Sequence, residues 1–219
     1  MDFKKLKDRL IQLDTASICD VSERIRIMDP EIRPINKGLK MVGIARTIHV
    51  KVDFLTVLKA LHDAEEDEVL VIDAEGDKKA LAGELFALEA QRKKLAGIVV
   101  DGGCRDVYGI RKINFPLFAR YITPIAGAAS KIFSTQIEIN CGGVSVSPGD
   151  IVYGDDDGIV VMNPEDVTEI LETAENIQRI ENKVLEKMEE GTSLTDLLNF
   201  HDHHAKIDRN EESKLIFTV

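Results

Sequence analysis

Hydrophobic positions in the first third of the chain recur with two different periods. A leucine stripe at helical spacing predicts one or two helices within residues 3–27, for which Thr15 and Ser17 are candidate caps. Residues 43–52 alternate and are rich in β-branched side chains, which predicts a strand. Residues 53–63 return to a helical pattern. The chain therefore opens with helices, then a strand, then a further helix.

The middle of the chain alternates between short apolar runs and amphipathic stretches. The predicted elements, in order, are a buried strand at 69–73, a helix that begins after Gly83, an apolar strand at 97–101 broken by Gly102 and Gly103, a short helix from Arg105, and a strand at 116–119. Strands that are apolar on both faces and alternate with helices are typical of a parallel sheet. We therefore predict an α/β fold.

The last hundred residues change pattern twice. Short strands are predicted at 137–139, 144–146, 151–153 and 158–161, separated by turns rich in Gly, Pro and Asp. Pro164 then suits the first turn of a long helix over 164–190, which Gly191 ends, and Ser193 can cap a last short helix. We expect one domain over residues 1–200, and a polar, mobile tail over 201–219.

Composition narrows the class of protein. Hydrophobic residues make up 44% of the chain but aromatic residues only 5%, with no Trp, so the core should be aliphatic. With 28 Lys and Arg against 39 Asp and Glu, the net charge of −11 disfavours nucleic acid and anionic membranes. We see no signal peptide or membrane span. Three scattered cysteines, Cys19, Cys104 and Cys141, indicate buried thiols in a reducing cytoplasm.

Residues Gly83-Glu84-Leu85-Phe86 are the first candidate site. A helix that begins after glycine leaves its first N–H groups without acceptors, and the helix dipole adds positive potential there. A substrate carboxylate could therefore bind the amides of Leu85 and Phe86. The plainer alternative is an ordinary helix start whose first turn carries an acidic residue.

The second candidate site is the sequence from Asp101 to Asp106, Asp-Gly-Gly-Cys-Arg-Asp. It follows an apolar strand, and ligands bind at the carboxyl ends of parallel strands. The guanidinium of Arg105 can fork onto a carboxylate or an enolate oxygen. Asp106 can give one hard oxygen to Mg²⁺ or Mn²⁺ that keeps several waters. The alternative is a surface Arg–Asp pair; the spacing of a phosphate-binding loop is absent.

Taken together, the two segments resemble a known family. Glu84, twenty residues, then Arg105-Asp106 is similar to the acidic-X20-Arg-Asp signature of the class II pyruvate aldolases, within the RraA-like family named for regulator of ribonuclease activity A. Further segments resemble the family in order along the chain, at residues 70–73, 83–86, 97–106, 115–119, 147–150 and 154–161. The resemblance runs from Thr15 to Leu198.

This resemblance implies a fold, an assembly and roles for particular residues. It implies a β/β/α swivelling-type fold and a homotrimer or hexamer with sites at subunit interfaces. It makes Asp106 the ligand of Mg²⁺ or Mn²⁺, Arg105 and Gly83–Phe86 the substrate-binding elements, and Glu84 a catalytic residue. Glu181, on the long helix, resembles a residue that reaches the metal's water shell from a neighbouring subunit. Its alternative is an ordinary salt-bridge residue.

The implied activity is that of a carbon–carbon lyase. The substrates would be small 2-oxo acids of the 4-hydroxy-4-methyl-2-oxoglutarate or 4-carboxy-4-hydroxy-2-oxoadipate type, cleaved to pyruvate plus a 2-oxo acid, with oxaloacetate decarboxylation as a side activity. The alternative within the family is a non-catalytic regulator that binds and inhibits an RNA-degrading endonuclease. Some members of the family carry a methyltransferase name. This sequence does not support that activity, because it has no glycine-rich nucleoside-binding signature.

Two departures from the aldolase pattern bear on the activity. Gly109 stands where aldolases often carry an acidic residue, three positions after the aspartate of the Arg-Asp pair. Glu84 stands where many have Asp, and its longer side chain changes the reach to a metal-bound water.

Three further groups of residues could carry chemistry, and for each we favour a plainer interpretation. His201, His203 and His204 could bind a metal, but they lie in a polar tail and are expected to be solvated. Residues 155–157, all Asp, lack the other ligands of a calcium loop and predict a turn. Lys51 could form a Schiff base, although nothing in its neighbourhood should depress its pKa.

Overall fold

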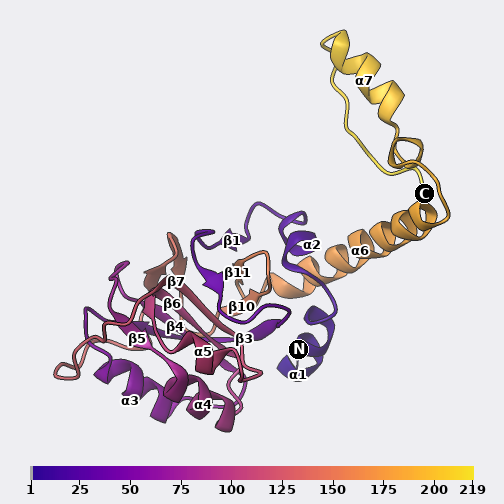
Figure 1. Cartoon of the computed structure of the whole chain (residues 1–219). Helices are drawn as coiled ribbons and strands as arrows, with labels where there is room; N and C mark the ends of the chain where they lie inside the picture. The colour runs from indigo at the N-terminus through magenta and orange to yellow at the C-terminus, as the bar shows by residue number, and fades with distance from the viewer. Residues whose placement is uncertain (1) are drawn as a thin grey trace. The chain divides into compact units, whose positions relative to one another are not determined.

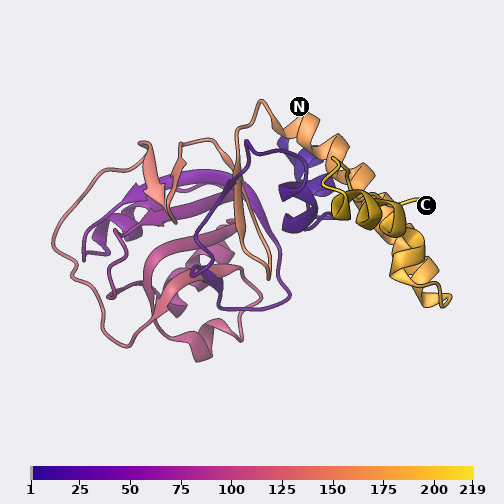
Figure 2. The same cartoon turned by 90° about the horizontal axis from the view of Figure 1, so that it is seen from above.

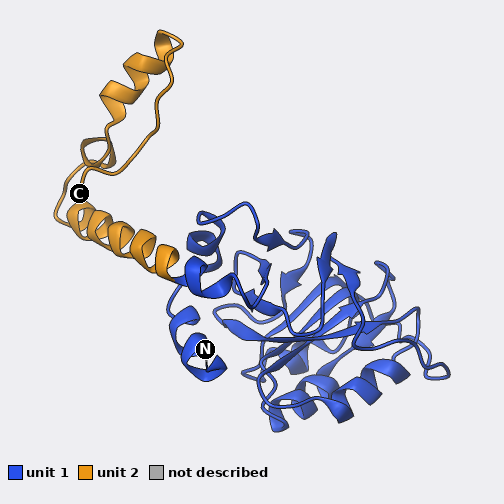
Figure 3. Ribbon diagram, turned by 180° about the vertical axis from the view of Figure 1, so that it is seen from behind, with its two compact units in different colours: residues 1–171 blue, residues 172–219 orange. Residues whose placement is uncertain are grey.

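The structure is a computed structural model that describes residues 2–219, and it divides into two compact units (Figure 3). Unit 1 ends at Leu171 and unit 2 covers Glu172–Val219. The division lies within the long helix α6, Val167–Glu189. The sequence placed the end of the domain at residue 200, which stays a prediction.

A nine-stranded mixed sheet forms the frame of unit 1 (Figure 1). Its order is β1-β11-β10-β3-β4-β6-β7-β2, with β5 beside β6. The four neighbours β3, β4, β6 and β7 are parallel, as the sequence predicts, and β1, β2, β10 and β11 pair antiparallel. A separate hairpin joins β8 to β9. The strands are β1 Arg26–Ile27, β2 Arg33–Pro34, β3 Met41–His49, β4 Glu68–Asp73, β5 Ala80–Ala82, β6 Gly97–Cys104, β7 Leu117–Ile122, β8 Ile139–Cys141, β9 Val144–Val146, β10 Ile151–Gly154 and β11 Ile159–Met162.

Apolar layers cover both faces of this sheet, because successive residues of a strand point to opposite sides. One layer lies under α3 (Leu55–Asp63) and α4 (Glu84–Arg92) and includes Ile72 and Val100 of the central strands (Figure 1). The other includes Val71 and packs against the β8–β9 hairpin. Aliphatic residues dominate both layers, as the composition predicts.

The remaining helices lie at the ends of the chain or connect strands. They are α1 Phe3–Leu10, α2 Thr15–Cys19, α5 Val107–Ile110, the 3-10 helix η1 Leu194–Leu197 and α7 Phe200–Asp208. A long connection between β7 and β8 runs along the outside of unit 1 (Figure 2). Within residues 2–219, no helix has both the length and the apolar composition that crossing a membrane would need.

The prediction that Gly102 and Gly103 break the central strand is wrong, because β6 continues to Cys104. Both glycines let neighbouring segments approach the strand closely, by a side chain at Gly102 and by backbone at Gly103. A Cβ atom at Gly102 would lie 2.7 Å from the Cβ of Ala74, and one at Gly103 would lie 2.6 Å from the carbonyl oxygen of Lys79. The extended β6 also pairs with β5, a three-residue strand that the pattern did not predict.

Predictions at both ends of the chain also need correction. Helix α2 ends at Cys19, and residues 26–27 form a strand, so the helical prediction to residue 27 is wrong. The cap of α2 is Asp14, whose side chain accepts a hydrogen bond from Ser17 N. The tail over residues 201–219 includes most of α7, and its predicted mobility stays a prediction.

Candidate active site at the start of α4

Helix α4 begins without a side-chain cap. Gly83 is extended at the N-cap, with φ of −169°, and no side chain accepts from the first turn. The first bond of the helix runs from Ala87 N to Gly83 O, at 3.1 Å. Within residues 2–219, the amides of Leu85 and Phe86 therefore donate to no acceptor. The free amides that the sequence predicts are present, and the binding of an anion to them stays a prediction.

The turn from β6 into α5 brings Asp106 to this helix start. Arg105 N donates to Ala82 O at 3.2 Å, which ties the turn to the residue before Gly83. Asp106 caps α5 in the left-handed region, with φ of 60° and ψ of 31°. A Cβ atom at Gly83 would lie 2.7 Å from Asp106 Oδ2. The missing side chain of Gly83 thus makes room for this carboxylate.

Arg105 and Asp106 are neighbours but stay accessible. Arg105 Nε lies 3.4 Å from Asp106 Oδ2, and the two side chains are 45% and 44% exposed. A pair of this length and exposure contributes about 0–1 kcal/mol to stability. Both groups are therefore available to a ligand.

Glu84 reaches across from α4 to α5 and lies over Gly109. A Cβ atom at Gly109 would be 2.5 Å from Glu84 Oε1 and closer still to Oε2. The carboxylate therefore occupies the space that any side chain at position 109 would need. The two departures noted in the sequence are thus one structural arrangement, in which glycine makes room for the longer acid.

The cavity at this place is small in one chain. It measures about 40 Å³ and is lined by residues of β5, of the start of α4 and of the β6–α5 turn, together with Phe54 and Ala126. Since a water molecule occupies about 30 Å³ of liquid, one chain does not enclose a diacid. Leu85, which lines the cavity, is 75% exposed, and Tyr108 on α5 is 77% exposed.

The donor set suits a hard, well-hydrated cation. Within residues 2–219, no three side chains of the His, Cys, Asp and Glu type gather in a way that could hold a metal. Asp106 offers half-exposed carboxylate oxygens beside an open helix start, and Glu84 offers two more nearby. Mg²⁺ and Mn²⁺ accept one or two carboxylates and fill their remaining positions with water. The residues present therefore fit such an ion.

The nearest thiol is not a nucleophile. Cys104 is buried behind the site, and burial, helped by the charge of Asp106, raises its pKa to about 12. Cys141 is buried too, and burial likewise raises its pKa. Cys19 is only half-buried, whereas the sequence analysis predicted a buried thiol.

Asp53 supports one wall of the site, and we did not identify it from the sequence. It is buried and accepts hydrogen bonds from the backbone N–H groups of Leu55, Ser130 and Lys131, at 2.9, 2.7 and 2.9 Å. Burial alone would raise its pKa, but these bonds together lower it below the ordinary value. Its position two residues before a helix was the one available signal.

Asp155 and Lys51 have the ordinary structural roles that the sequence analysis favoured over calcium binding and Schiff-base chemistry. Asp155 is buried in a turn and accepts from Thr15 N and Oγ1, at 2.8 and 2.7 Å. Lys51 is 2.9 Å from Glu75, and this hydrogen bond raises the lysine pKa, the reverse of what a Schiff-base lysine needs.

The remaining residues named from the sequence lie in unit 2. On α7, His201 and His204 are exposed, whereas His203 lies 3.0 Å from Ser213 Oγ and is half-buried. Glu181 lies on α6. Its predicted place at a neighbouring subunit's metal stays a prediction.

Comparisons of the sequence with known proteins identify the family. The sequence profile of the RraA-like family, described as Aldolase/RraA, matches residues 15–161. A protein of Halalkalibacterium halodurans, provisionally named 4-hydroxy-4-methyl-2-oxoglutarate aldolase, is 37% identical over 168 residues, which cover 76% of this chain and 80% of that protein.

Solved structures share the fold. An uncharacterized protein of Pseudomonas syringae superposes with a TM-score of 0.79 at 25% identity, covering 88% of this chain and 96% of the other. RraAS2 of Streptomyces coelicolor, titled an unusual member of the RNase ES inhibitor RraA family, gives 0.74 at 27% identity, covering 84% and 98%. The mixed sheet with its covering helices is therefore the fold of these proteins, as the resemblance implied.

Proposed function

The chain belongs to the RraA-like family, and from that premise we propose that it is a carbon–carbon lyase that depends on Mg²⁺ or Mn²⁺. Its substrate would be a 4-hydroxy-2-oxo acid, cleaved to pyruvate and a second 2-oxo acid. The observation that carries the proposal is the meeting of Glu84, Arg105 and Asp106 at the uncapped start of α4.

The start of α4 would hold the substrate by its carboxylate. The amides of Leu85 and Phe86 have no acceptor in the described chain, and the helix dipole favours an anion there. Arg105 would then donate to the 2-oxo oxygen, which becomes the enolate oxygen when the bond between C3 and C4 breaks. A donor aimed at developing charge stabilises the transition state more than the ground state.

Glu84 would carry out the proton transfer, by way of a water molecule. The 4-hydroxyl must lose a proton as the carbon–carbon bond breaks, and the methyl carbon of pyruvate must gain one. A water held by Glu84 could take up the first proton and return it to carbon, so that the cleavage is balanced. A cation on Asp106, when bound, would chelate the substrate and add Lewis-acid stabilisation of the same oxyanion. The same enolate forms when oxaloacetate loses CO₂, which makes decarboxylation the expected side activity.

A second subunit would complete the pocket. One chain encloses only about 40 Å³, and Leu85, which lines this cavity, is 75% exposed in the single chain. Exposed apolar groups beside a site are typical of a surface that another protein covers. We therefore propose a homotrimer, or a hexamer built from trimers, with this cavity at a subunit interface.

Pyruvate release tests the function directly. The protein should release pyruvate from 4-hydroxy-4-methyl-2-oxoglutarate or 4-carboxy-4-hydroxy-2-oxoadipate, and from oxaloacetate, with Mg²⁺ or Mn²⁺ but not with EDTA. Borohydride added with pyruvate should trap no adduct on the protein. Cleavage that persists in EDTA, or a trapped adduct, would place the protein in the other aldolase class.

A second candidate function follows from the Streptomyces coelicolor relative, which is described as an unusual member of an RNase ES inhibitor family. The net charge of −11 suits contact with a basic protein partner. Under this alternative the chain would bind and inhibit an RNA-degrading endonuclease and release no pyruvate. The pyruvate assay therefore distinguishes the two functions.

A further inference from the structure

A second, larger cavity lies beside the end of α5, away from the start of α4. It measures about 530 Å³ and is formed by residues 34–39 and residues 111–114. Its lining includes the cations Lys37, Arg111 and Lys112 and contains no Asp or Glu. All the charged side chains that line this cavity are positive, although the net charge of the chain is −11.

None of these cations is neutralised within residues 2–219. Lys37 forms no ion pair there, and Lys112 places its ammonium 4.0 Å from the centre of the Tyr108 ring. Arg111 makes only a long hydrogen bond, 3.5 Å, from Nε to Ile35 O. Three positive charges with no counter-charge attract an anion, and they repel one another until one binds.

Asn36 prepares the cavity wall for an anion. Its side-chain amide donates to the carbonyl oxygens of Ile110, Ile113 and Phe115, at 2.9, 2.7 and 3.2 Å. These carbonyls belong to the turn that ends α5, and their negative ends would otherwise oppose an anion. The backbone N–H groups of Lys37 and Asn114 donate to no acceptor within residues 2–219, so they remain available to a ligand.

The side-chain oxygen of Asn36 lacks a hydrogen-bond donor in the described chain. Its Oδ1 atom is buried and has no hydrogen-bond partner within residues 2–219, although the residue is only 8% exposed. A buried acceptor without a donor costs free energy, and it commonly marks a place for ordered water or a ligand. A water molecule can supply the missing donor but an anion cannot, so the case for an anion is carried by the three cations.

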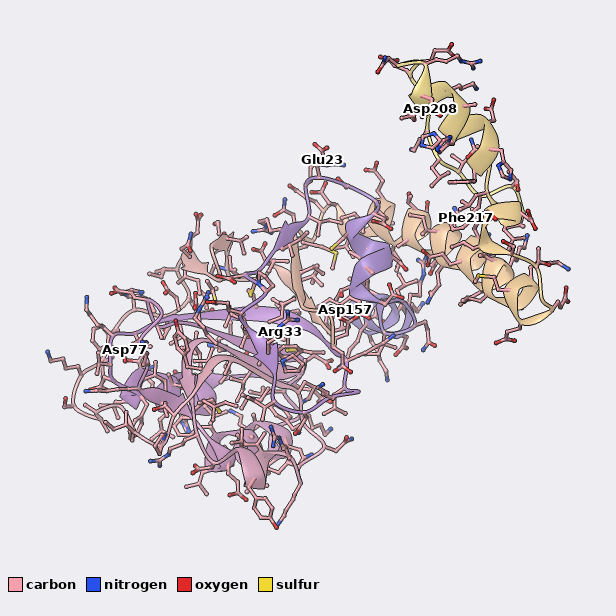
Figure 4. All side chains as sticks on the ribbon, turned by 45° about the horizontal axis from the view of Figure 1, so that its top comes forward. Glu23, Arg33, Asp77, Asp157, Asp208 and Phe217 are labelled. Atoms are coloured by element: carbon pink, nitrogen blue, oxygen red, sulfur yellow. The ribbon has the colours of Figure 1, made fainter. Side chains whose placement is uncertain are left out.

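Two charged side chains lie near the cavity without lining it. Asp156 accepts from Gly38 N, at 2.9 Å, and keeps its negative charge, but it forms no ion pair with Lys37. Arg33 donates from Nη1 to the carbonyl of Asp157, at 3.3 Å, near the turn between β10 and β11 (Figure 4). Asp156 therefore lowers the positive potential near Gly38, and Arg33 is not part of the set.

We propose that Lys37, Arg111 and Lys112 form a binding site for a small organic polyanion that carries carboxylate or phosphate groups. A cavity of this size is within the range that holds small metabolites. A guanidinium forks onto either kind of oxyanion, and the two ammonium groups add point charge. The site is separate from the start of α4 and does not depend on the lyase activity proposed above.

Titration calorimetry with three probes tests the site. Inorganic phosphate, pyrophosphate and citrate are titrated into the full-length protein at low ionic strength, with no divalent cation present. We expect citrate or pyrophosphate to bind with a Kd of about 1 mM or below. Tighter citrate than pyrophosphate would identify carboxylates as the ligand groups, and the reverse order would identify phosphates. Absence of binding by all three probes would overturn the proposal.

Charge variants show where the probe binds. Arg111→Gln and Lys37→Gln should each weaken binding about tenfold or more, as the loss of a charge-assisted hydrogen bond predicts. Asn114→Asp, which adds an acid to the exposed lining, should weaken it as well. Lys5→Gln, on the exposed surface of α1, removes the same charge elsewhere and should leave binding unchanged.

Arg105→Gln separates this cavity from the candidate active site. Binding should survive Arg105→Gln and be lost in Arg111→Gln, with equal melting temperatures for both variants. The reverse result would assign the anion to the start of α4 and overturn the proposal. Equal weakening by Lys5→Gln and Arg111→Gln would show unspecific attraction and would overturn it too.

Discussion

The carboxylate of Glu84 fills the space that a side chain at Gly109 would occupy. The two residues are on consecutive helices, α4 and α5, whose starts form the candidate active site. Any enlargement of residue 109 must therefore move the acid that we place at the proton-transfer step.

The first prediction enlarges this glycine. Gly109→Ala should displace Glu84 and lower turnover about 10²-fold or more, the range associated with the loss of a positioned general acid or base. Pyruvate release measures the effect. Gly158→Ala is the matched control, because a Cβ atom there would meet nothing within 4 Å.

Shortening the acid should relieve the same overlap. The double variant Glu84→Asp with Gly109→Ala should lose less turnover than the product of the two single losses, because aspartate retreats from the new methyl group. Full activity of Gly109→Ala alone would remove Glu84 from the mechanism.

The second prediction separates Arg105 from Asp106. Arg105→Lys keeps the charge but loses the planar fork, and it should cost about 10²–10³ in turnover. Asp106→Asn should first weaken metal affinity, so excess Mn²⁺ should restore part of its activity and hardly any of that of Arg105→Lys. Both variants should melt near the wild type, since the pair is half-exposed and 3.4 Å apart. Unfolded variants whose residual folded fraction stays fully active would show instead that the pair is structural.

The third prediction uses the backbone of Asp106. Its φ of 60° is unfavourable for most residues and easy for glycine. Asp106→Gly should therefore abolish metal-dependent activity while the melting temperature stays the same or rises. A fall in melting temperature would mean that the carboxylate stabilises the fold, contrary to its proposed role in function.

The fourth prediction concerns pH and Asp53. Its pKa is lower in the folded protein than in the unfolded chain, so its stabilising effect is present above the unfolded pKa of about 3.9. That effect is lost as pH falls through the lower, folded pKa. Urea unfolding should show a stability difference between wild type and Asp53→Asn that is constant near neutral pH and shrinks below about pH 4. A difference that grows as the pH falls would contradict the assignment.

The fifth prediction tests assembly. Light scattering should report a trimer or hexamer, and Tyr108→Glu should shift it toward monomer, because Tyr108 is 77% exposed on α5. Leu58→Glu, at a position 47% exposed on α3, should keep the assembly. Helix α6 also carries an apolar stripe, but this stripe gives little support for a trimer. Much of that stripe is buried within the chain, including Val167, Ile170, Ala174 and Val184. A monomer at micromolar concentration would refute the prediction.

The local pattern of hydrophobic residues was sufficient to predict most of the strands of the central sheet. Strands that are apolar on both faces, such as residues 69–73 and 97–101, can only be buried between layers, so their type and order followed from the sequence. The helix after Gly83 and the turn at Arg105 were also found, because glycine and strand ends mark such places locally. These features depend on residues that are near one another along the chain.

Contacts between distant residues decided the rest. The continuation of β6 through Gly102 depends on Ala74, and the space above Gly109 depends on Glu84. The cationic cavity needs Lys37 and Arg111, which no periodic pattern connects. Pairs of this kind meet only when the sheet and its connections close, and side-chain volume then determines what fits. The sequence by itself determined which residues could carry chemistry, whereas the tertiary structure decided which of them share a site.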